Sequence, residues 1–191
     1  MSSNFAIEID EAIIRRAQQG DRRAFQTLYQ AFATPAYNLA RRMTRSESMA
    51  EEVLQEGMLL VYRRLEQFRF ESPFWGWVRM IFVNTTLSLL RSNSRRDKVI
   101  SLHEVLEGES RSRDTVPMDL EKALAKLSDK RRSVMWLYAV EGYTHQEIAE
   151  MLATTVSDSK IQLFRAREQL RTWWHDEHGE SANTSMADEL R

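Results

Sequence analysis

Residues 141–149 read Glu-Gly-Tyr-Thr-His-Gln-Glu-Ile-Ala, and this stretch does most to decide the fold. A glycine turn is followed by Thr144, with Glu147 three residues later, which is the capping-box pattern at the start of a helix. After a second break at 154–155, a basic helix is predicted up to about Trp174. Two helices joined by a tight turn, the second of them basic, are typical of a helix-turn-helix, in which the second helix reaches base edges in the major groove.

A second stretch, residues 77–84, reads Trp-Val-Arg-Met-Ile-Phe-Val-Asn and is predicted to lie on a helix from about Phe74 to Asn93. One side of this helix carries, at intervals of four and three residues, Trp77, Ile81, Asn84, Ser88, Arg91 and Arg95. A row that passes from aromatic to amide, hydroxyl and guanidinium groups can stack on an unpaired base, hydrogen-bond its edge and hold the flanking phosphates. The two stretches together indicate that two modules bind DNA at two places.

The hydrophobic pattern divides the chain into two helical segments. From about Asp10 to Ser94, apolar stripes recur at helical spacing; Gly20 and Asp21 interrupt them, and Pro35 permits a kink or a restart. The pattern is then lost in a stretch rich in serine and mixed charges, which is typical of a linker. We therefore predict an all-α fold of two small helical domains, residues 8–96 and 118–174, with a flexible linker at 97–117 and a disordered acidic tail at 175–191.

A helix predicted around residues 54–65 has two different sides. Its apolar side is expected to be one buried face, made of Leu54, Met58, Val61, Tyr62 and Leu65. Its polar side holds an acidic cluster of Glu51, Glu52, Gln55 and Glu56. Such a cluster is either a solvated surface or a face that docks on a basic partner, and the sequence leaves both readings open.

The helices of the second domain have predicted caps and a basic face. Ser128 with Asp129, and Thr155 with Asp158, are expected to cap two helix starts. On the last helix the outward row is predicted to be Lys160, Phe164, Arg167 and Arg171, and the inward face Leu163, Ala166 and Leu170. The alternative reading is an ordinary capped helix pair with a solvated basic face. For the aromatic residues the alternative is a core position, and because Trp75 and Trp77 cannot point the same way, we expect at least one of them in the core.

The composition excludes several classes of protein. At 191 residues, with 42% apolar and 29% charged residues, the chain is typical of soluble globular proteins. The absence of cysteine excludes disulfides, thiolate zinc sites and cysteine nucleophiles. There is no apolar run of the roughly 20 residues that a membrane span needs, and no signal segment at the N-terminus, so we expect a cytoplasmic protein.

The distribution of charge is compatible with DNA binding, and the sequence contains no pattern of a metal site or of an enzyme. The net charge of −1 is compatible with DNA binding because the positive charge is local: five basic residues lie between Arg79 and Lys98, against Asp97 alone. His175 and His178 have a spacing that occurs in metal sites, but further ligands are missing nearby and no metal site is predicted. We find neither a phosphate-binding loop nor a nucleophile with its base, so an enzyme is a distant alternative.

Taken together, these residues resemble the extracytoplasmic-function group of the sigma-70 family of bacterial RNA polymerase sigma factors. The resemblance extends from about Asp10 to Trp174. Residues 50–56, Ala-Glu-Glu-Val-Leu-Gln-Glu, are similar to the family's acidic region-two helix, and residues 77–84 followed by Arg91 are similar to the helix that reads the minus-ten element.

The resemblance implies roles for individual residues. In the family the acidic helix grips the clamp helices of the largest polymerase subunit, which implies core-polymerase contacts at Glu51, Glu52, Gln55 and Glu56. The loop at 68–74 would form a pocket for a base flipped from the non-template strand, with Asn84 contacting that base. The implied minus-ten contacts are Phe68, Phe70, Ser72, Trp77, Asn84, Ser88, Arg91, Arg95 and Arg96. The implied minus-thirty-five contacts are Lys160, Gln162, Phe164, Arg165 and Arg167.

The chain departs from the family's pattern at three places. Phe70 stands where a small loop residue is usual. Gly57 and Met58 stand where a threonine and a phenylalanine are common, and Gly57 is expected to cost about 1 kcal/mol of helix stability. Residues 157–162 read Ser-Asp-Ser-Lys-Ile-Gln in place of the common Gly-Thr-Val-Arg/Lys-Ser-Arg, so the base preference at the upstream element is not carried over.

The function expected from the sequence is that of an alternative sigma factor. Such a protein binds core RNA polymerase, recognises promoter DNA as duplex and as melted single strand, and promotes initiation without covalent chemistry or a cofactor of its own. The resemblance also implies an anti-sigma factor as partner. The chain is expected in the cytoplasm, or held at the inner membrane where that partner is membrane-bound, and is not itself expected to insert into the membrane. The alternative is a dimeric helix-turn-helix regulator that acts independently of polymerase, but it leaves the acidic cluster and the 77–84 helix unexplained.

Overall fold

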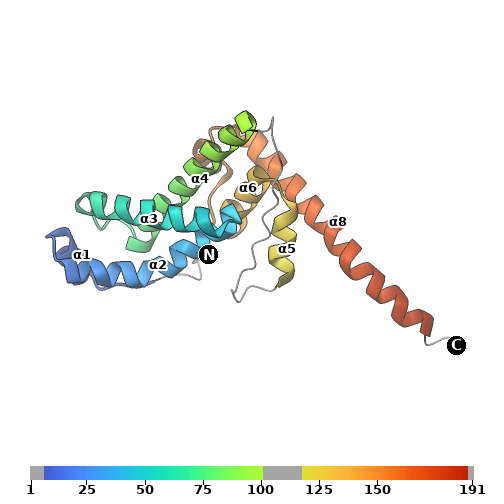
Figure 1. Cartoon of the computed structure of the whole chain (residues 1–191), viewed down its shortest axis with the longest axis horizontal. Coiled ribbons are helices and arrows are strands. Elements are labelled where there is room, and N and C mark those ends of the chain that lie inside the picture. Colours follow the sequence, from blue (N-terminus) through green and yellow to red (C-terminus); the bar gives the residue numbers. More distant parts are fainter. Residues whose placement is uncertain (1–6, 101–117, 189–191) are drawn as a thin grey trace. The chain divides into compact units, whose positions relative to one another are not determined.

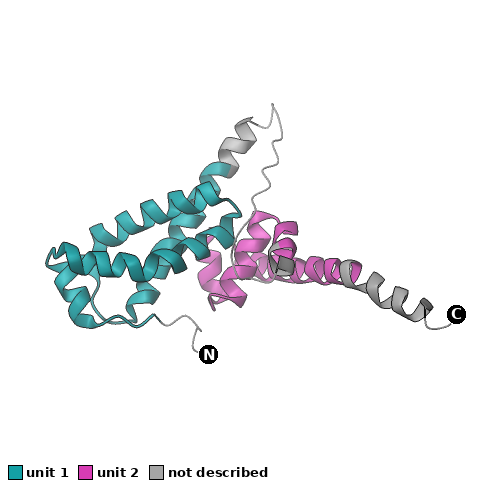
Figure 2. Cartoon of the chain, turned by 60° about the horizontal axis from the view of Figure 1, so that its bottom comes forward, with its two compact units in different colours: residues 1–111 teal, residues 112–191 magenta. Residues whose placement is uncertain are grey.

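The computed structural model describes residues 7–100 and 118–188, and every regular element in these two ranges is a helix. The chain divides into two compact units between Arg111 and Ser112 (Figure 2). The predicted all-α class with two helical domains is confirmed. Most of the expected linker, residues 101–117, lies outside the described residues.

The first unit consists of α1 (Glu11–Gln18), α2 (Arg22–Thr44), α3 (Glu47–Arg64), the 3-10 turn η1 (Leu65–Gln67) and α4 (Phe74–Ile100) (Figure 1). Its first three α-helices begin at side-chain caps supplied by Asp10, Asp21 and Ser46. Helix α2 passes through Pro35 without ending. Helices α2, α3 and α4 pack against one another and enclose the core of the unit.

The buried side of α3 differs from the predicted apolar stripe. Tyr62 is 54% exposed and Leu54 only half-buried, whereas Ala50, Val53 and Gly57 are buried together with the expected members. At Gly57 the burial follows from the close approach of α4, because a Cβ there would lie 2.5 Å from Cε1 of Phe82. A pattern based on large apolar residues does not register alanine and glycine, so the stripe was placed to one side of the true one.

Helix α4 ends later than predicted. The periodicity suggested an end at about Asn93 and a linker from residue 97, but the helix continues to Ile100. Residues 94–100 read Ser-Arg-Arg-Asp-Lys-Val-Ile, and without glycine or proline nothing in them stops a helix. The start was predicted correctly: Pro73 immediately precedes Phe74, and its carbonyl accepts a 3.3 Å hydrogen bond from the Trp77 amide.

The second unit consists of α5 (Met118–Lys126), α6 (Asp129–Ala139), α7 (His145–Met151) and α8 (Val156–Asp188). The capping box before α7 is confirmed: Thr144 Oγ1 accepts from the Glu147 amide at 3.3 Å, and the Glu147 carboxylate accepts from the Thr144 amide at 2.8 Å. Ser128 occupies the cap position of α6, although its side chain makes no capping hydrogen bond. Helix α8 packs against α5, α6 and α7.

The segment predicted as a disordered tail is helical over most of its length. Helix α8 was expected to end at about Trp174 but extends to Asp188. Disorder was predicted from the polarity of these residues, because polarity indicates that they have few apolar side chains to bury in a core. A helix satisfies its backbone hydrogen bonds internally, and a polar stretch without proline can therefore remain helical.

Candidate nucleic-acid interfaces

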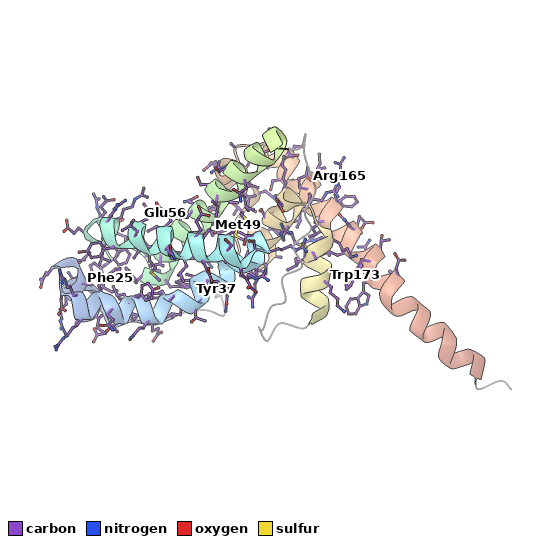
Figure 3. The ribbon with its side chains drawn as sticks, in the orientation of Figure 1. Phe25, Tyr37, Met49, Glu56, Arg165 and Trp173 are labelled. Carbon is purple, nitrogen blue, oxygen red and sulfur yellow. The ribbon has the colours of Figure 1, made fainter. Side chains whose placement is uncertain are left out.

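Helix α8 has the two sides that a recognition helix needs. Ser159, Leu163 and Ala166 face inward and are buried. The outward side exposes the predicted contacts Lys160, Phe164, Arg165 and Arg167, with Phe164 65% exposed (Figure 3 labels Arg165). The turn before α8 is tight, because Ala153 adopts a left-handed φ of 50° and the Thr154 amide donates to the Ala149 carbonyl at 2.9 Å. This is the helix-turn-helix geometry that the sequence predicted.

Asp158 organises the start of α8. Thr155 Oγ1 accepts from the Asp158 amide at 3.0 Å, which confirms the predicted cap. The Asp158 carboxylate accepts from Gln162 Nε2 at 3.0 Å, from Lys130 Nζ at 2.8 Å and from Thr154 Oγ1 at 2.6 Å. These donors, Gln162 first, hold the pKa of the Asp158 carboxyl well below its usual range.

Because of this bond to Asp158, Gln162 is less free to contact DNA than its prediction as a minus-thirty-five contact assumes. Its side chain is half-buried, and one amide hydrogen is already donated to Asp158. A second hydrogen and the amide oxygen remain for a base. The sequence holds a signal for this relation that was not used, because a carboxylate lies four residues before an amide on one helix.

His145 connects three helices of the second unit. Its Nδ1 lies 2.9 Å from Ser159 Oγ on α8, and its ring stacks on Tyr138 of α6 with centroids 4.5 Å apart. Burial lowers the pKa of His145, and the charges of Lys160 and Arg167 lower it further. The ring is therefore neutral at pH 7 and fixes α7 against α8. No pattern in the sequence pointed to this contact.

On α4 the predicted row is divided into a buried and an exposed part. Ile81 is buried and Trp77 half-buried, whereas Asn84, Ser88 and Arg91 are exposed. Only the part from Asn84 onward is thus open to a ligand, and it passes from amide to hydroxyl to guanidinium as predicted. The side chains of Arg95 and Arg96 lie outside the described residues.

The aromatic residues at the start of α4 form a packed cluster. Trp75 is the core member of the tryptophan pair: it is buried and stacks on Phe32, with centroids 5.4 Å apart. Trp77 lies beside Phe68 at 5.5 Å and Phe74 at 5.7 Å. Because the core holds one tryptophan fully and the other in part, the expectation for this pair is confirmed.

The residues of the loop at 68–73 differ in their exposure to solvent. Phe68 is 5% exposed and packs on Phe70 and Phe74 at centroid distances of 4.9 and 5.0 Å. In this conformation the Phe68 ring is packed beneath its aromatic neighbours and is not exposed to a ligand, and its direct contact with DNA stays a prediction. Phe70 is half-buried with a left-handed φ of 60°, and Ser72 is exposed.

The acidic cluster on α3 is open to solvent. Glu51, Glu52, Gln55 and Glu56 are all exposed (Figure 3 labels Glu56). Within the part of the chain that the structure describes, these four side chains form neither ion pairs nor hydrogen bonds with other side chains. They occupy two neighbouring rows of one helix and are available to a basic surface. In the same described ranges, no three His, Asp or Glu side chains gather as metal ligands, and no helix is long and apolar enough to span a bilayer.

In a comparison with known proteins, each of the two units matches a family model. Residues 28–96 match the model for Sigma-70 region 2, and residues 118–170 match the model for Sigma-70, region 4. The RNA polymerase sigma-H factor of Pseudomonas aeruginosa is 28% identical over 178 residues, covering 85% of this chain and 92% of that protein. The ECF RNA polymerase sigma-E factor of Haemophilus influenzae is 29% identical over 176 residues, covering 84% and 93%.

Two solved structures share the fold. The sigma factor RpoE from Bartonella quintana, solved in complex with the anti-sigma factor NepR, has a TM-score of 0.56 and 18% identity, covering 78% of this chain and 94% of that one. CnrH, solved in complex with the cytosolic domain of CnrY, has a TM-score of 0.54 and 23% identity, covering 87% and 97%. At these identities the likeness concerns the fold alone.

Proposed function

Because the chain belongs to the extracytoplasmic-function group of the sigma-70 family, we propose that it is an alternative sigma factor that binds core RNA polymerase and promotes transcription initiation. The observation that carries this proposal is the pairing of two helical units, each matching a different sigma region and each exposing polar side chains on one helix. The chain contributes binding, and RNA synthesis is the chemistry of the polymerase.

The second unit is proposed to hold the minus-thirty-five duplex. Helix α8 enters the major groove with Lys160, Phe164, Arg165 and Arg167 outward, while Gln162 is oriented by Asp158. The basic side chains position the helix on the phosphates, and the amide and apolar groups face the base edges.

The first unit is proposed to capture the melted minus-ten strand. Asn84, Ser88 and Arg91 form an exposed row that follows a single strand, and the loop with Phe70 and Ser72 receives an unpaired base. Trp77 and Phe68 support this site from beneath as part of the aromatic cluster. Arg95 and Arg96 continue the basic character of α4 in the sequence.

The acidic cluster on α3 is proposed to dock on core polymerase. Glu51, Glu52, Gln55 and Glu56 are exposed and unpaired within the described ranges, which suits a basic partner surface. The cytoplasm, where core polymerase works, is the proposed location. The Bartonella quintana relative was solved with an anti-sigma factor, and we propose such a partner here too, since both units expose large apolar side chains, among them Tyr62 and Phe164.

Run-off transcription with purified core polymerase on a genomic promoter pool tests the function. Specific transcripts are expected only when this chain is added. The double variant Glu52→Lys, Glu56→Lys should lose transcription and core binding but keep duplex binding, whereas Glu8→Lys, an exposed charge reversal on the same unit, should leave all three unchanged. Duplex binding without any polymerase-dependent initiation would instead favour a helix-turn-helix regulator.

A further inference from the structure

Helix α1 precedes the residues that match Sigma-70 region 2, yet it holds the loop that follows η1. On the premise of the proposed function, we propose that Arg15 and Gln18 of α1 are positioning residues for base capture. They hold the loop at 68–73 in the conformation that receives an unpaired base. Neither residue needs to touch DNA for this role.

Gln18 is bonded to the two ends of the turn before the loop. Its Nε2 donates to the carbonyl of Leu65 at 2.9 Å and to the carbonyl of Phe68 at 3.0 Å. The Phe68 amide also donates to the Leu65 carbonyl at 3.1 Å, which closes the turn. A side-chain amide carries two hydrogens, so Gln18 uses its full donor capacity on this one segment. The contacts span 47 and 50 residues of chain, and they fix where the loop begins.

Arg15 contacts the centre of the loop. Its guanidinium carbon lies 4.2 Å from the centroid of the Phe70 ring, within the range of a cation–π interaction. Phe70 has a φ of 60°, which a bulky residue adopts only when its surroundings hold it there. The contacts that do so are Arg15 and the ring of Phe68, whose centroid is 4.9 Å away.

These contacts bear on binding through preorganisation. A loop that is already ordered loses little conformational entropy when a base enters it, whereas a loose loop must be ordered at that moment. Removing the α1 contacts should therefore weaken capture of the melted strand. It should leave the duplex contact of α8 and the polymerase contact of α3 intact, because these lie on other elements.

The test uses holoenzyme assembled from core polymerase and the full chain. The probes are a fork DNA with an unpaired non-template strand across a minus-ten element, taken from a promoter active in run-off assays, and the same DNA with an abasic site at each unpaired position in turn. The variants are Gln18→Ala and Arg15→Gln. Their controls are Gln19→Ala and Arg16→Gln, since Gln19 is exposed and Arg16 pairs with Asp21 rather than with the loop.

Gln18→Ala and Arg15→Gln should each lower fork affinity by roughly three- to tenfold, with unchanged minus-thirty-five binding and assembly with core polymerase. The ratio between intact and abasic DNA should shrink in these variants, and Arg15→Lys, which keeps the cation, should restore part of it. The Arg15 variants carry the test should Gln18→Ala fail to fold, because the Arg15 side chain is exposed.

Two results would overturn the inference alone: fork binding unchanged in both variants, or a loss that is equal for intact and abasic DNA. The second result would assign α1 a merely structural role. Failure of the wild-type holoenzyme to bind the fork at all would overturn the proposed function, and the inference with it.

Discussion

The ring of Phe82 on α4 occupies the space that a side chain at Gly57 on α3 would need. A Cβ at Gly57 would lie 2.5 Å from Cε1 of Phe82, far inside the contact distance of two carbon atoms. Both residues are buried, so neither has solvent to move into. The close packing of α3 on α4 therefore depends on the missing side chain at position 57.

Gly57→Ala is expected to destabilise the first unit. Overpacking should lower the free energy of unfolding by about 1–3 kcal/mol, and a gain in helix propensity of about 1 kcal/mol offsets part of this, which leaves a net loss of up to about 2 kcal/mol. Hydrogen exchange of the α3 and α4 amides measures this within the full chain. Gly76→Ala is the matched control, because a Cβ there meets nothing within 4 Å. Gains of equal size from both substitutions would contradict the packing argument.

The sequence predicted helices where periodicity and caps agree, as at Thr144 with Glu147 before α7. It misjudged Gly57 because a glycine in a helix registers only as a loss of propensity until its neighbour Phe82 is known. It also misplaced the ends of α4 and α8, because the loss of an apolar stripe marks the end of burial and not the end of a helix.

For the candidate sites, the sequence predicted exposed surfaces better than mutual contacts. The outward side of α8 and the row from Asn84 to Arg91 are exposed as amphipathic spacing predicts, although Ile81 of the same row on α4 is buried. The burial of Phe68 was not foreseeable, because a lone aromatic residue in a loop fits both the core and a stacking site. The hydrogen bonds of Gln18 join residues far apart in the chain, which no local pattern encodes.

Asn84→Ala should weaken open-complex formation more than duplex binding. Asn84 is exposed at the start of the polar row on α4, and under the proposed function its amide hydrogen-bonds the edge of an unpaired base. The loss should be about 1–2 kcal/mol on fork DNA and negligible on the minus-thirty-five duplex. Met80→Ala, an exposed change on the same helix, is the control. Equal losses on both DNAs would contradict this role.

Arg165→Ala should reduce binding to the upstream element and flatten its dependence on salt. A phosphate contact releases counterions, so its removal should lower the slope of log K against log salt by about one. Titration of a labelled duplex at several salt concentrations measures the slope. Lys122→Ala removes an exposed charge from α5 and should leave it unchanged. An unaltered slope for Arg165→Ala would indicate a packing role instead.

Asp158→Asn should destabilise the helix-turn-helix by about 1 kcal/mol at pH 7, because the donors that hold its carboxylate lose a charged acceptor. The pKa of Asp158 is lower in the folded chain than its ordinary 3.8, so its contribution is complete above that value and declines as pH falls below it. Hydrogen exchange of α6–α8 at several pH values checks this, with Ser157→Ala as control. A difference in stability between wild type and variant that is equally large at about pH 2 and at neutral pH would contradict this pH dependence.

Ile161 is expected to read a thymine methyl group in the minus-thirty-five element. Its side chain is 44% exposed on α8, next to Lys160 and near the 65% exposed Phe164, so the apolar surface is flanked by charge that suits DNA. Ile161→Ser should weaken duplex binding by about 1 kcal/mol. Replacing thymine by deoxyuridine in the duplex should weaken binding of the wild type by a similar amount. It should leave binding of the variant almost unchanged, as measured by fluorescence anisotropy. Val140→Ser, at 41% exposure outside α8, is the control. Because only the methyl group differs between the two DNAs, an equal response of wild type and Ile161→Ser would refute this contact.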